Sequence, residues 1–236
     1  MLQVLPVALQ NSWLALVLTI VISYLLGSVS TAVIVSKCMF REDVREKGSG
    51  NAGATNVLRN YGKKAAIFTT IGDLGKSIIA VFIGGLLMEH LQLTHAPGIS
   101  EISLQIIGRY LGGACCVFGH LFPIFFGFKG GKGVMTSCGL ILILDIRAAL
   151  ICLLTFGIVL ALSKMVSLAS VIAVFIAPFL VYLFGYHVDH HSPETVTFCV
   201  TVISIIVLSV IIKHRTNIVR IIHGNENKLS FGKKDK

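Results

Sequence analysis

The chain has 236 residues, a formal net charge of +9 and only 13% charged residues, whereas soluble domains average about 25%. Its mean hydropathy of +0.86 means that one soluble core would not bury all of its apolar residues, so lipid is the expected solvent for the surplus. A basic charge also occurs in nucleic-acid-binding proteins, but no basic repeat and no interleaving of basic with aromatic residues supports a nucleic acid partner here.

Seven apolar runs are candidate membrane spans, at 13–36, 65–88, 105–126, 134–144, 148–162, 167–186 and 195–212. The segment before the first run carries no Lys or Arg, so we expect no cleavable signal peptide. The runs 134–144 and 148–162 are short for a bilayer that takes roughly 20 helical residues. They are either two short or partly re-entrant spans, or one bent segment broken at Asp145–Arg147, which would give six spans.

The charges of the loops decide between these alternatives. Basic residues gather in 37–64 and 213–236, which places both segments in the cytoplasm, whereas 89–104 and 187–194 carry no Lys or Arg and are expected outside. An outer N-terminus and a cytoplasmic C-terminus require an odd number of crossings. The sequence therefore predicts a single all-α membrane domain, residues 1–236, with seven transmembrane helices.

Two arginines, Arg109 and Arg147, break the charge rule, and Arg147 has Asp145 beside it. The six cysteines form no C-x-x-C pair and lie mostly in apolar runs, so we interpret them as packing residues. We predict that the chain binds no metal. The alternative is weak metal binding by His187, His190 and His191.

The first polar motif is the glycine-rich segment 48–59. Its glycines match G-x-G-x-x-G, but no strand precedes them and an apolar span follows, so we expect no dinucleotide cofactor. Glycines bring backbone N–H groups close to a ligand, and Arg59 offers a planar fork to phosphate or carboxylate. The segment adds neutral donors at Ser49, Asn51, Thr55 and Asn56. The alternative is a flexible loop with helix caps.

The second motif, 72–77, lies inside the second run and contains Asp73 and Lys76. The two residues are i,i+3 neighbours, so they can pair across one helical turn. Ionisable residues inside a span are costly and usually face an interior site. A purely structural pair is an equally open alternative.

The third motif spans 119–136 and includes Lys129-Gly-Gly-Lys-Gly133. This loop resembles an anion cradle at the start of a helix. It is not a Walker A loop, because Lys132 is followed by Gly133 and not by Ser or Thr. The alternative is that the two lysines only keep this loop on the cytoplasmic side of the membrane, but that role would not require the glycines.

The fourth motif, 213–228, follows the last apolar run. His214 and Asn217 are spaced to share a helix face, which favours a site at the membrane surface. The alternative is an amphipathic basic helix that lies on anionic headgroups.

In their order and spacing, the segments 48–59, 72–76, 119–133 and 214–226 resemble the bacterial acyl-phosphate:glycerol-3-phosphate acyltransferase family. The resemblance covers nearly the whole chain, except that Ser77 stands where the family has Gly after Lys76. It implies a small seven-span enzyme of the bacterial cytoplasmic (inner) membrane, with a cytoplasmic active site and no cofactor. The implied reaction transfers a fatty acyl group from acyl phosphate to the 1-hydroxyl of sn-glycerol 3-phosphate, giving lysophosphatidic acid and phosphate.

Carried over residue by residue, the resemblance implies catalytic roles for Ser49, Arg59, Lys132, His214 and Asn217. It also implies that Lys129, Gly130, Gly131 and Gly133 contact substrate phosphate, with His120 nearby, and that Glu226 supports the site. We add Gly50, Asn51, Thr55 and Asn56 as substrate-binding residues because the glycine-rich segment offers their donors to a ligand. The expected partners are acyl phosphate, glycerol 3-phosphate and membrane lipid, with no protein partner assigned. The general base is His120, His214 or, slightly favoured, the substrate's own phosphate.

Two rival functions are a transporter for phosphorylated solutes and a non-catalytic lipid-binding protein. A transporter predicts ionisable residues through the spans and at both mouths. Because the polar motifs of this chain lie on one predicted face, we favour an enzyme at the cytoplasmic membrane surface.

Overall fold

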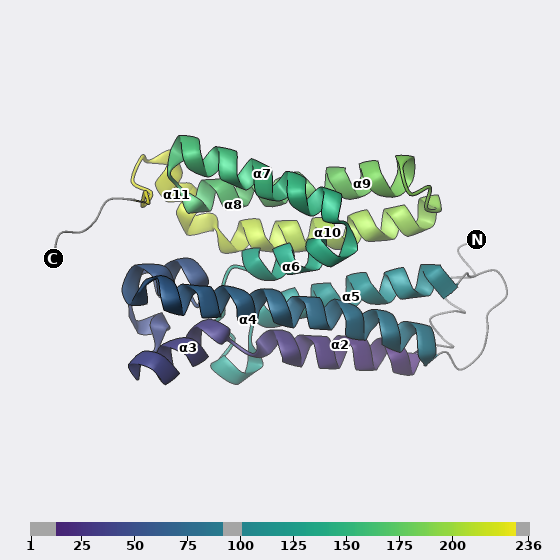
Figure 1. The fold of residues 1–236 in the computed structure, drawn as a ribbon, viewed down its shortest axis with the longest axis horizontal. Coiled ribbons are helices and arrows are strands. Elements are labelled where there is room, and N and C mark those ends of the chain that lie inside the picture. The colour runs from purple at the N-terminus through teal and green to yellow at the C-terminus, as the bar shows by residue number, and fades with distance from the viewer. Residues whose placement is uncertain (1–12, 92–100, 230–236) are drawn as a thin grey trace.

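The computed structural model describes residues 13–91 and 101–229, and within these ranges the regular structure is entirely helical (Figure 1). Two 3-10 turns, η1 (Val44–Glu46) and η2 (Ile124–Phe126), lie in the connections. The α-helices are α2 (Trp13–Ser28), α3 (Thr31–Phe40), α4 (Ala54–His90), α5 (Glu101–Leu121), α6 (Val134–Leu144), α7 (Ile146–Ser163), α8 (Val166–Phe175), α9 (Ala177–His187), α10 (Pro193–Lys213) and α11 (Arg215–Ile222).

Six helical segments of the described chain are long and apolar enough to cross a membrane: α2 with α3, α4, α5, α7, α8 with α9, and α10. Each coincides with one of the apolar runs of the sequence. The seventh run is α6, whose 11 residues extend about 16 Å, or half of a bilayer core. The chain is therefore an integral, multi-pass helical membrane protein.

The chain reverses direction between α6 and α7, so the two runs are not one bent segment (Figure 1). Asp145 caps α7 by accepting hydrogen bonds from the backbone N–H groups of Arg147 and Ala148. The guanidinium of Arg147 pairs with Asp145 at 2.7 Å and with Asp189 at 2.6 Å. Two carboxylates thus offset the charge of Arg147, which explains why it departs from the loop-charge rule.

Helix α2 ends at Ser28 and α3 starts at Thr31, where the sequence suggested one uninterrupted run. This break leaves backbone carbonyls without helical donors, and a buried one needs another partner. Lys76 of α4 supplies it, because its ammonium donates to the carbonyls of Gly27 at 3.1 Å and Val29 at 2.9 Å. The predicted pairing of Asp73 with Lys76 is confirmed, with 2.9 Å between Oδ1 and Nζ.

Helices α2, α4 and α5 pack tightly on one side, α7 to α10 form a second group, and α6 lies between them (Figure 1). Glycines allow the close contact of α4 with α5: a Cβ on Gly108 would lie 2.2 Å from the carbonyl oxygen of Gly84. Small residues serve this purpose at helix crossings in membranes. The tight group provides a rigid wall for the polar site that follows.

Candidate active site

A cavity of about 160 Å³ lies at the end of the bundle where α4 begins and α10 meets α11. It brings together residues of all four motifs, which are far apart in the sequence. Eleven of the predicted site residues line it: Ser49, Asn51, Thr55, Asn56, Arg59, His120, Lys132, Gly133, His214, Asn217 and Glu226. The four motifs thus converge in space around one cavity, and the roles predicted for their residues stay predictions.

Four predicted residues, Gly50, Lys129, Gly130 and Gly131, do not line this cavity. Lys129 is exposed, so its contact with a phosphate stays a prediction. Gly131 packs directly on His120, since its N–H donates to the His120 carbonyl at 3.1 Å. A Cβ on Gly131 would lie 2.2 Å from Nε2 of His120. The loop therefore needs a glycine here to fit against the imidazole ring.

The loop that carries Ser49 is organised by Asn56, which is buried in the first turn of α4. Its Oδ1 accepts from the Ser49 backbone N–H at 3.0 Å, and its Nδ2 donates to the carbonyls of Val44 and Lys47, both at 3.0 Å. These contacts use the whole amide. We therefore assign Asn56 the positioning of Ser49, and its predicted contact with substrate stays untested.

An ion pair ties this loop to the third motif. Arg45 forms a bidentate contact with Asp43, at 2.8 and 3.0 Å, and donates to the carbonyl of Phe126 at 2.7 Å. The hydrogen bonds from Arg45 lower the pKa of Asp43 to about 2. Both groups therefore stay charged at neutral pH, and the two loops are held together.

Lys132 is held by a network of side chains from α8, α11 and the segment after α11. Its ammonium donates to Oδ1 of Asn217, and Nδ2 of Asn217 donates to Oε1 of Glu226 at 2.8 Å. Glu226 also accepts from Ser167 at 3.0 Å and from Arg220 at 2.9 Å. Burial favours the neutral acid, but these donors outweigh it and lower the pKa of Glu226.

Sequence reasoning missed Ser167 as a member of this network. A single serine inside an apolar run gives no periodic signal, and its partner Glu226 lies 59 residues away. Arg220 was not among the predicted site residues either. Its side chain lines the cavity together with Ser167 and Ser170.

Burial changes the proton affinity of two groups in the cavity. It lowers the pKa of Lys132 to about 8, an effect that the Arg220 and Arg59 charges reinforce and that Glu226 opposes. It lowers the pKa of His214 to about 4. The cavity therefore holds a neutral imidazole and an ammonium that loses its proton more readily than a surface lysine does.

The ring of His214 has a defined orientation. Its Nδ1 lies 2.8 Å from the carbonyl oxygen of Val210. A carbonyl only accepts, so Nδ1 carries the proton of the neutral ring and Nε2 has the free lone pair.

Arg59 is exposed, and the described residues offer its guanidinium no hydrogen bond or ion pair. By contrast, the carboxylates that line the cavity, Asp73 and Glu226, are both paired with cations or donors. A free guanidinium beside Lys132, with neutral donors from the Ser49 loop, is an arrangement suited to binding a phosphate group.

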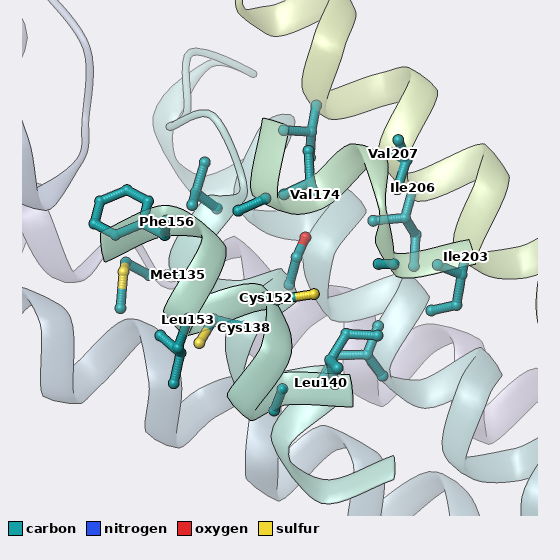
Figure 2. Close-up of a pocket in the computed structure, with 17 residues that line it drawn as sticks. Met135, Cys138, Leu140, Cys152, Leu153, Phe156, Val174, Ile203, Ile206 and Val207 are labelled. Atoms are coloured by element: carbon teal, nitrogen blue, oxygen red, sulfur yellow. The ribbon is translucent and has the colours of Figure 1, made fainter. Parts of the chain in front are cut away.

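A second cavity, of about 200 Å³, adjoins the polar one and is lined almost wholly by apolar side chains (Figure 2). Val134, Met135 and Phe156 line both cavities, so the two lie directly next to each other. In Figure 2, Met135 and Phe156 lie near one end, and Leu140 and Ile203 lie toward the other. A smaller engineered apolar cavity of about 150 Å³ stays dry and binds apolar ligands.

The apolar cavity runs along α6 toward the middle of the membrane. Its lining includes Leu140 and Ile141 of α6, Ala149 of α7, Ala177 of α9 and Ile203 of α10. From Val134 to Ile141 the helix rises about 10 Å, which sets the scale of the cavity's depth. Nothing in the sequence singled out these residues, because in a membrane protein apolar side chains toward lipid and toward a cavity look alike.

The sequence model of the family described as glycerol-3-phosphate acyltransferase matches residues 17–224 of the chain. A glycerol-3-phosphate acyltransferase of Neisseria meningitidis serogroup C (strain 053442) is 39% identical over 210 residues, covering 89% of this chain and 95% of that protein. Its counterpart in Clostridioides difficile (strain 630) is 38% identical over 215 residues, covering 89% and 93%.

Two crystal structures of PlsY (YgiH), an integral membrane glycerol 3-phosphate acyltransferase, have a similar fold. The glycerol 3-phosphate form is 30% identical, with a TM-score of 0.76, and the match covers 91% of this chain and 96% of that one. The lysophosphatidic acid form has a TM-score of 0.74 at 30% identity, covering 91% and 95%.

Proposed function

The chain belongs to the glycerol-3-phosphate acyltransferase family, and from this premise we propose that it takes the acyl group from acyl phosphate. It is a glycerol-3-phosphate acyltransferase that produces lysophosphatidic acid. The proposal concerns the donor, the roles of the residues and the orientation in the membrane.

The observation that carries the proposal is the junction of the two cavities at Val134, Met135 and Phe156. Acyl phosphate has a phosphate group at one end and a long alkyl chain at the other. The polar cavity offers Arg59 and Lys132 to the phosphate groups of both substrates. The apolar cavity takes the alkyl chain, with the acyl carbonyl near the junction.

The acyl phosphate donor fits the chemistry of the site. Acyl phosphate is a mixed anhydride, and its phosphate is a good leaving group, so positioning and electrostatic stabilisation supply most of the acceleration. No histidine has an aspartate five residues later, as thioester-using acyltransferases of the H-x-x-x-x-D type require, and no nucleotide-binding loop is present.

The reaction is a direct transfer. The 1-hydroxyl oxygen of glycerol 3-phosphate bonds to the acyl carbon, the bond from that carbon to the phosphate oxygen breaks, and inorganic phosphate leaves. Arg59 and Lys132 hold the phosphates through charge-assisted hydrogen bonds. Ser49 acts as a donor to phosphate or to the developing oxyanion, because the described residues place no base beside its hydroxyl.

The proton of the attacking hydroxyl goes to the phosphate of glycerol 3-phosphate itself. An effective general base has a pKa near the operating pH. The pKa of His214 is about 4, so its imidazole is a weak base at neutral pH. A phosphate monoester, with a second pKa of about 6, is better matched.

The proposed orientation has the N-terminus outside and the C-terminus in the cytoplasm, with seven crossings if the half-length α6 is counted. It is supported by α2 beginning and α11 ending at opposite ends of the bundle (Figure 1). The proposed location is the bacterial cytoplasmic membrane, with the site on the cytoplasmic face. Reporters inserted at His190 and fused after Lys236, which lies outside the described residues, should report opposite faces, and reporters on one face would refute this orientation.

The donor is tested with purified protein in lipid nanodiscs. We expect acyl phosphate and glycerol 3-phosphate to give lysophosphatidic acid and one equivalent of inorganic phosphate, with negligible product from acyl-CoA. Equal turnover with acyl-CoA would refute the acyl phosphate proposal while leaving the family assignment intact.

A further inference from the structure

A buried cluster of ionisable residues adjoins the polar cavity, which two of its members, Asp73 and His120, help to line. It consists of Asp73 and Lys76 on α4 and His120 on α5, whose side chains are 6% exposed or less. Thr31 at the start of α3 donates to Asp73 Oδ1 at 2.6 Å. Burying ionisable groups at this depth is costly, which marks them as candidates for function.

The hydrogen bonds of Lys76 determine which nitrogen of His120 carries the proton. The Lys76 ammonium lies 3.1 Å from Nδ1 of His120. The ammonium shares its three protons among Nδ1, Asp73 and the carbonyls of Gly27 and Val29. It has no acceptor, so a proton on Nδ1 would face a cation that cannot accept it, and Nδ1 is the unprotonated nitrogen. Asp73 Oδ1 is 3.4 Å from Nδ1, outside the usual range of about 2.7–3.2 Å for an N–H···O hydrogen bond.

The single proton of the neutral ring therefore resides on Nε2. That nitrogen has no hydrogen-bond partner among residues 13–91 and 101–229, and His120 lines the polar cavity. It lies against Gly131, at the loop that also carries Lys132. The ring thus presents a donor, and not a lone pair, to the place where the substrate phosphates are expected.

We propose that Asp73 and Lys76 are positioning residues that fix His120 as its Nε2–H tautomer, so that His120 donates a hydrogen bond to substrate phosphate. This inference rests on the proposed function of the cavity. Asp73 balances the charge of Lys76, which allows the ammonium to remain buried beside the ring. His120 is then a binding donor and is not the general base.

The two imidazole rings of the cavity carry their protons on different nitrogens. His120 receives a hydrogen bond at Nδ1 from Lys76, whereas His214 donates from Nδ1 to the carbonyl of Val210. One ring offers an N–H to the cavity and the other offers a lone pair. Their different partners, and not their shared residue type, decide these roles.

The first test is nitrogen NMR of the full-length protein in nanodiscs, with ¹⁵N in the histidine rings. The signals of His120 are identified by their loss in His120→Gln. We expect a protonated Nε2 and an unprotonated Nδ1 in the wild type, and a mixture of tautomers in Lys76→Met. The matched control Lys64→Met changes an exposed lysine of the same helix and should leave the signals unchanged.

A protonated Nδ1 in the wild type would overturn the proposal. So would an unaltered tautomer in folded Lys76→Met. This readout does not depend on turnover, so it separates the tautomer assignment from the acyl phosphate proposal.

The second test compares His120→Gln with His120→Leu. The glutamine amide can place an N–H near the position of Nε2, but it cannot take up a proton as a base. We expect His120→Leu to lose about a hundredfold in kcat/KM, the upper end of what one hydrogen bond to a charged group contributes. His120→Gln should keep activity within about tenfold of wild type. Equal losses in the two variants, each with a native melting temperature, would contradict a donor role.

Discussion

The Lys132 ammonium donates a hydrogen bond to the side-chain oxygen of Asn217, 85 residues further along the chain. This contact joins the glycine-rich loop before α6 to α11. Asn217 is itself held by Glu226 at 2.8 Å. The lysine is thus fixed in the cavity and largely removed from water, which gives it a lowered pKa and a testable pH dependence.

The pH profile of kcat/KM should fall on the alkaline side as Lys132 loses its charge. A cation is charged below its pKa, so phosphate binding is intact below about pH 8 and weakens as the pH rises through that value. Because kcat/KM reports the free enzyme, the decline should centre near pH 8. Arginine stays charged well above this range, so Lys132→Arg should lose this decline even if its rate is lower. An unchanged decline in that variant would refute the assignment to Lys132.

The acidic side of the same profile identifies the general base. If the phosphate of glycerol 3-phosphate takes the proton, kcat/KM should fall below about pH 6, the second pKa of a phosphate monoester. This decline should persist in His214→Gln. If His214 were the base, the decline would centre near pH 4, the pKa of its ring, and would vanish in His214→Gln. The profiles of wild type and variant, measured on the same lipid, decide between the two.

The apolar cavity should govern the length of acyl chain that the enzyme accepts. Ala149 is 2% exposed and lines this cavity from the first turns of α7, which follow the end of α6. Ala149→Leu should fill part of the cavity away from the Val134 end of α6, so the rate with long-chain acyl phosphates should fall relative to short-chain ones. Overpacking can also destabilise the protein, by about 1–3 kcal/mol, so melting temperature is measured alongside.

The matched control is Ala161→Leu, the same change at an exposed position of the same helix. It should leave the ratio of long-chain to short-chain rates unchanged. An equal ratio in Ala149→Leu and wild type would show that the alkyl chain binds elsewhere.

The sequence predicted the helical elements well because lipid imposes a simple rule. A span must be apolar and long, and the loop charges report its direction. Thus α6 has the predicted bounds, 134–144. The chain also reverses direction at Asp145, as the loop charges predicted when they favoured two separate segments over one bent one. The break between α2 and α3 was missed, because Lys76, a residue distant in sequence, donates to two of the carbonyls at the break.

The polar site was predicted less completely, for a different reason. Motifs with unusual residues, such as the Ser49 loop and Lys132, stand out in an apolar chain, and the structure brings them together. Asn56 was predicted to bind substrate because its residue type can donate. The structure uses its amide inside the loop, which only the three-dimensional contacts reveal. Ser167 gave no signal at all, since its role depends on Glu226.

The central claim is that Arg59 and Lys132 hold substrate phosphates, and steady-state kinetics of four variants test it most directly. A charge-assisted hydrogen bond contributes about 1.5–3 kcal/mol, roughly ten- to a hundredfold in kcat/KM. We expect Arg59→Ala and Lys132→Ala to lose activity to this extent or more while the protein stays folded in the membrane. Arg59→Lys should fail nearly as badly, because an ammonium cannot replace the planar fork.

The control for these measurements is Lys63→Ala, which removes an exposed cation from the same basic region. It should be nearly silent. The predicted result is therefore a steep loss in the three cavity variants beside a normal control, with rates normalised to folded protein. Near-normal kcat/KM in both Arg59→Ala and Lys132→Ala would contradict the account and leave these cations as topology signals only.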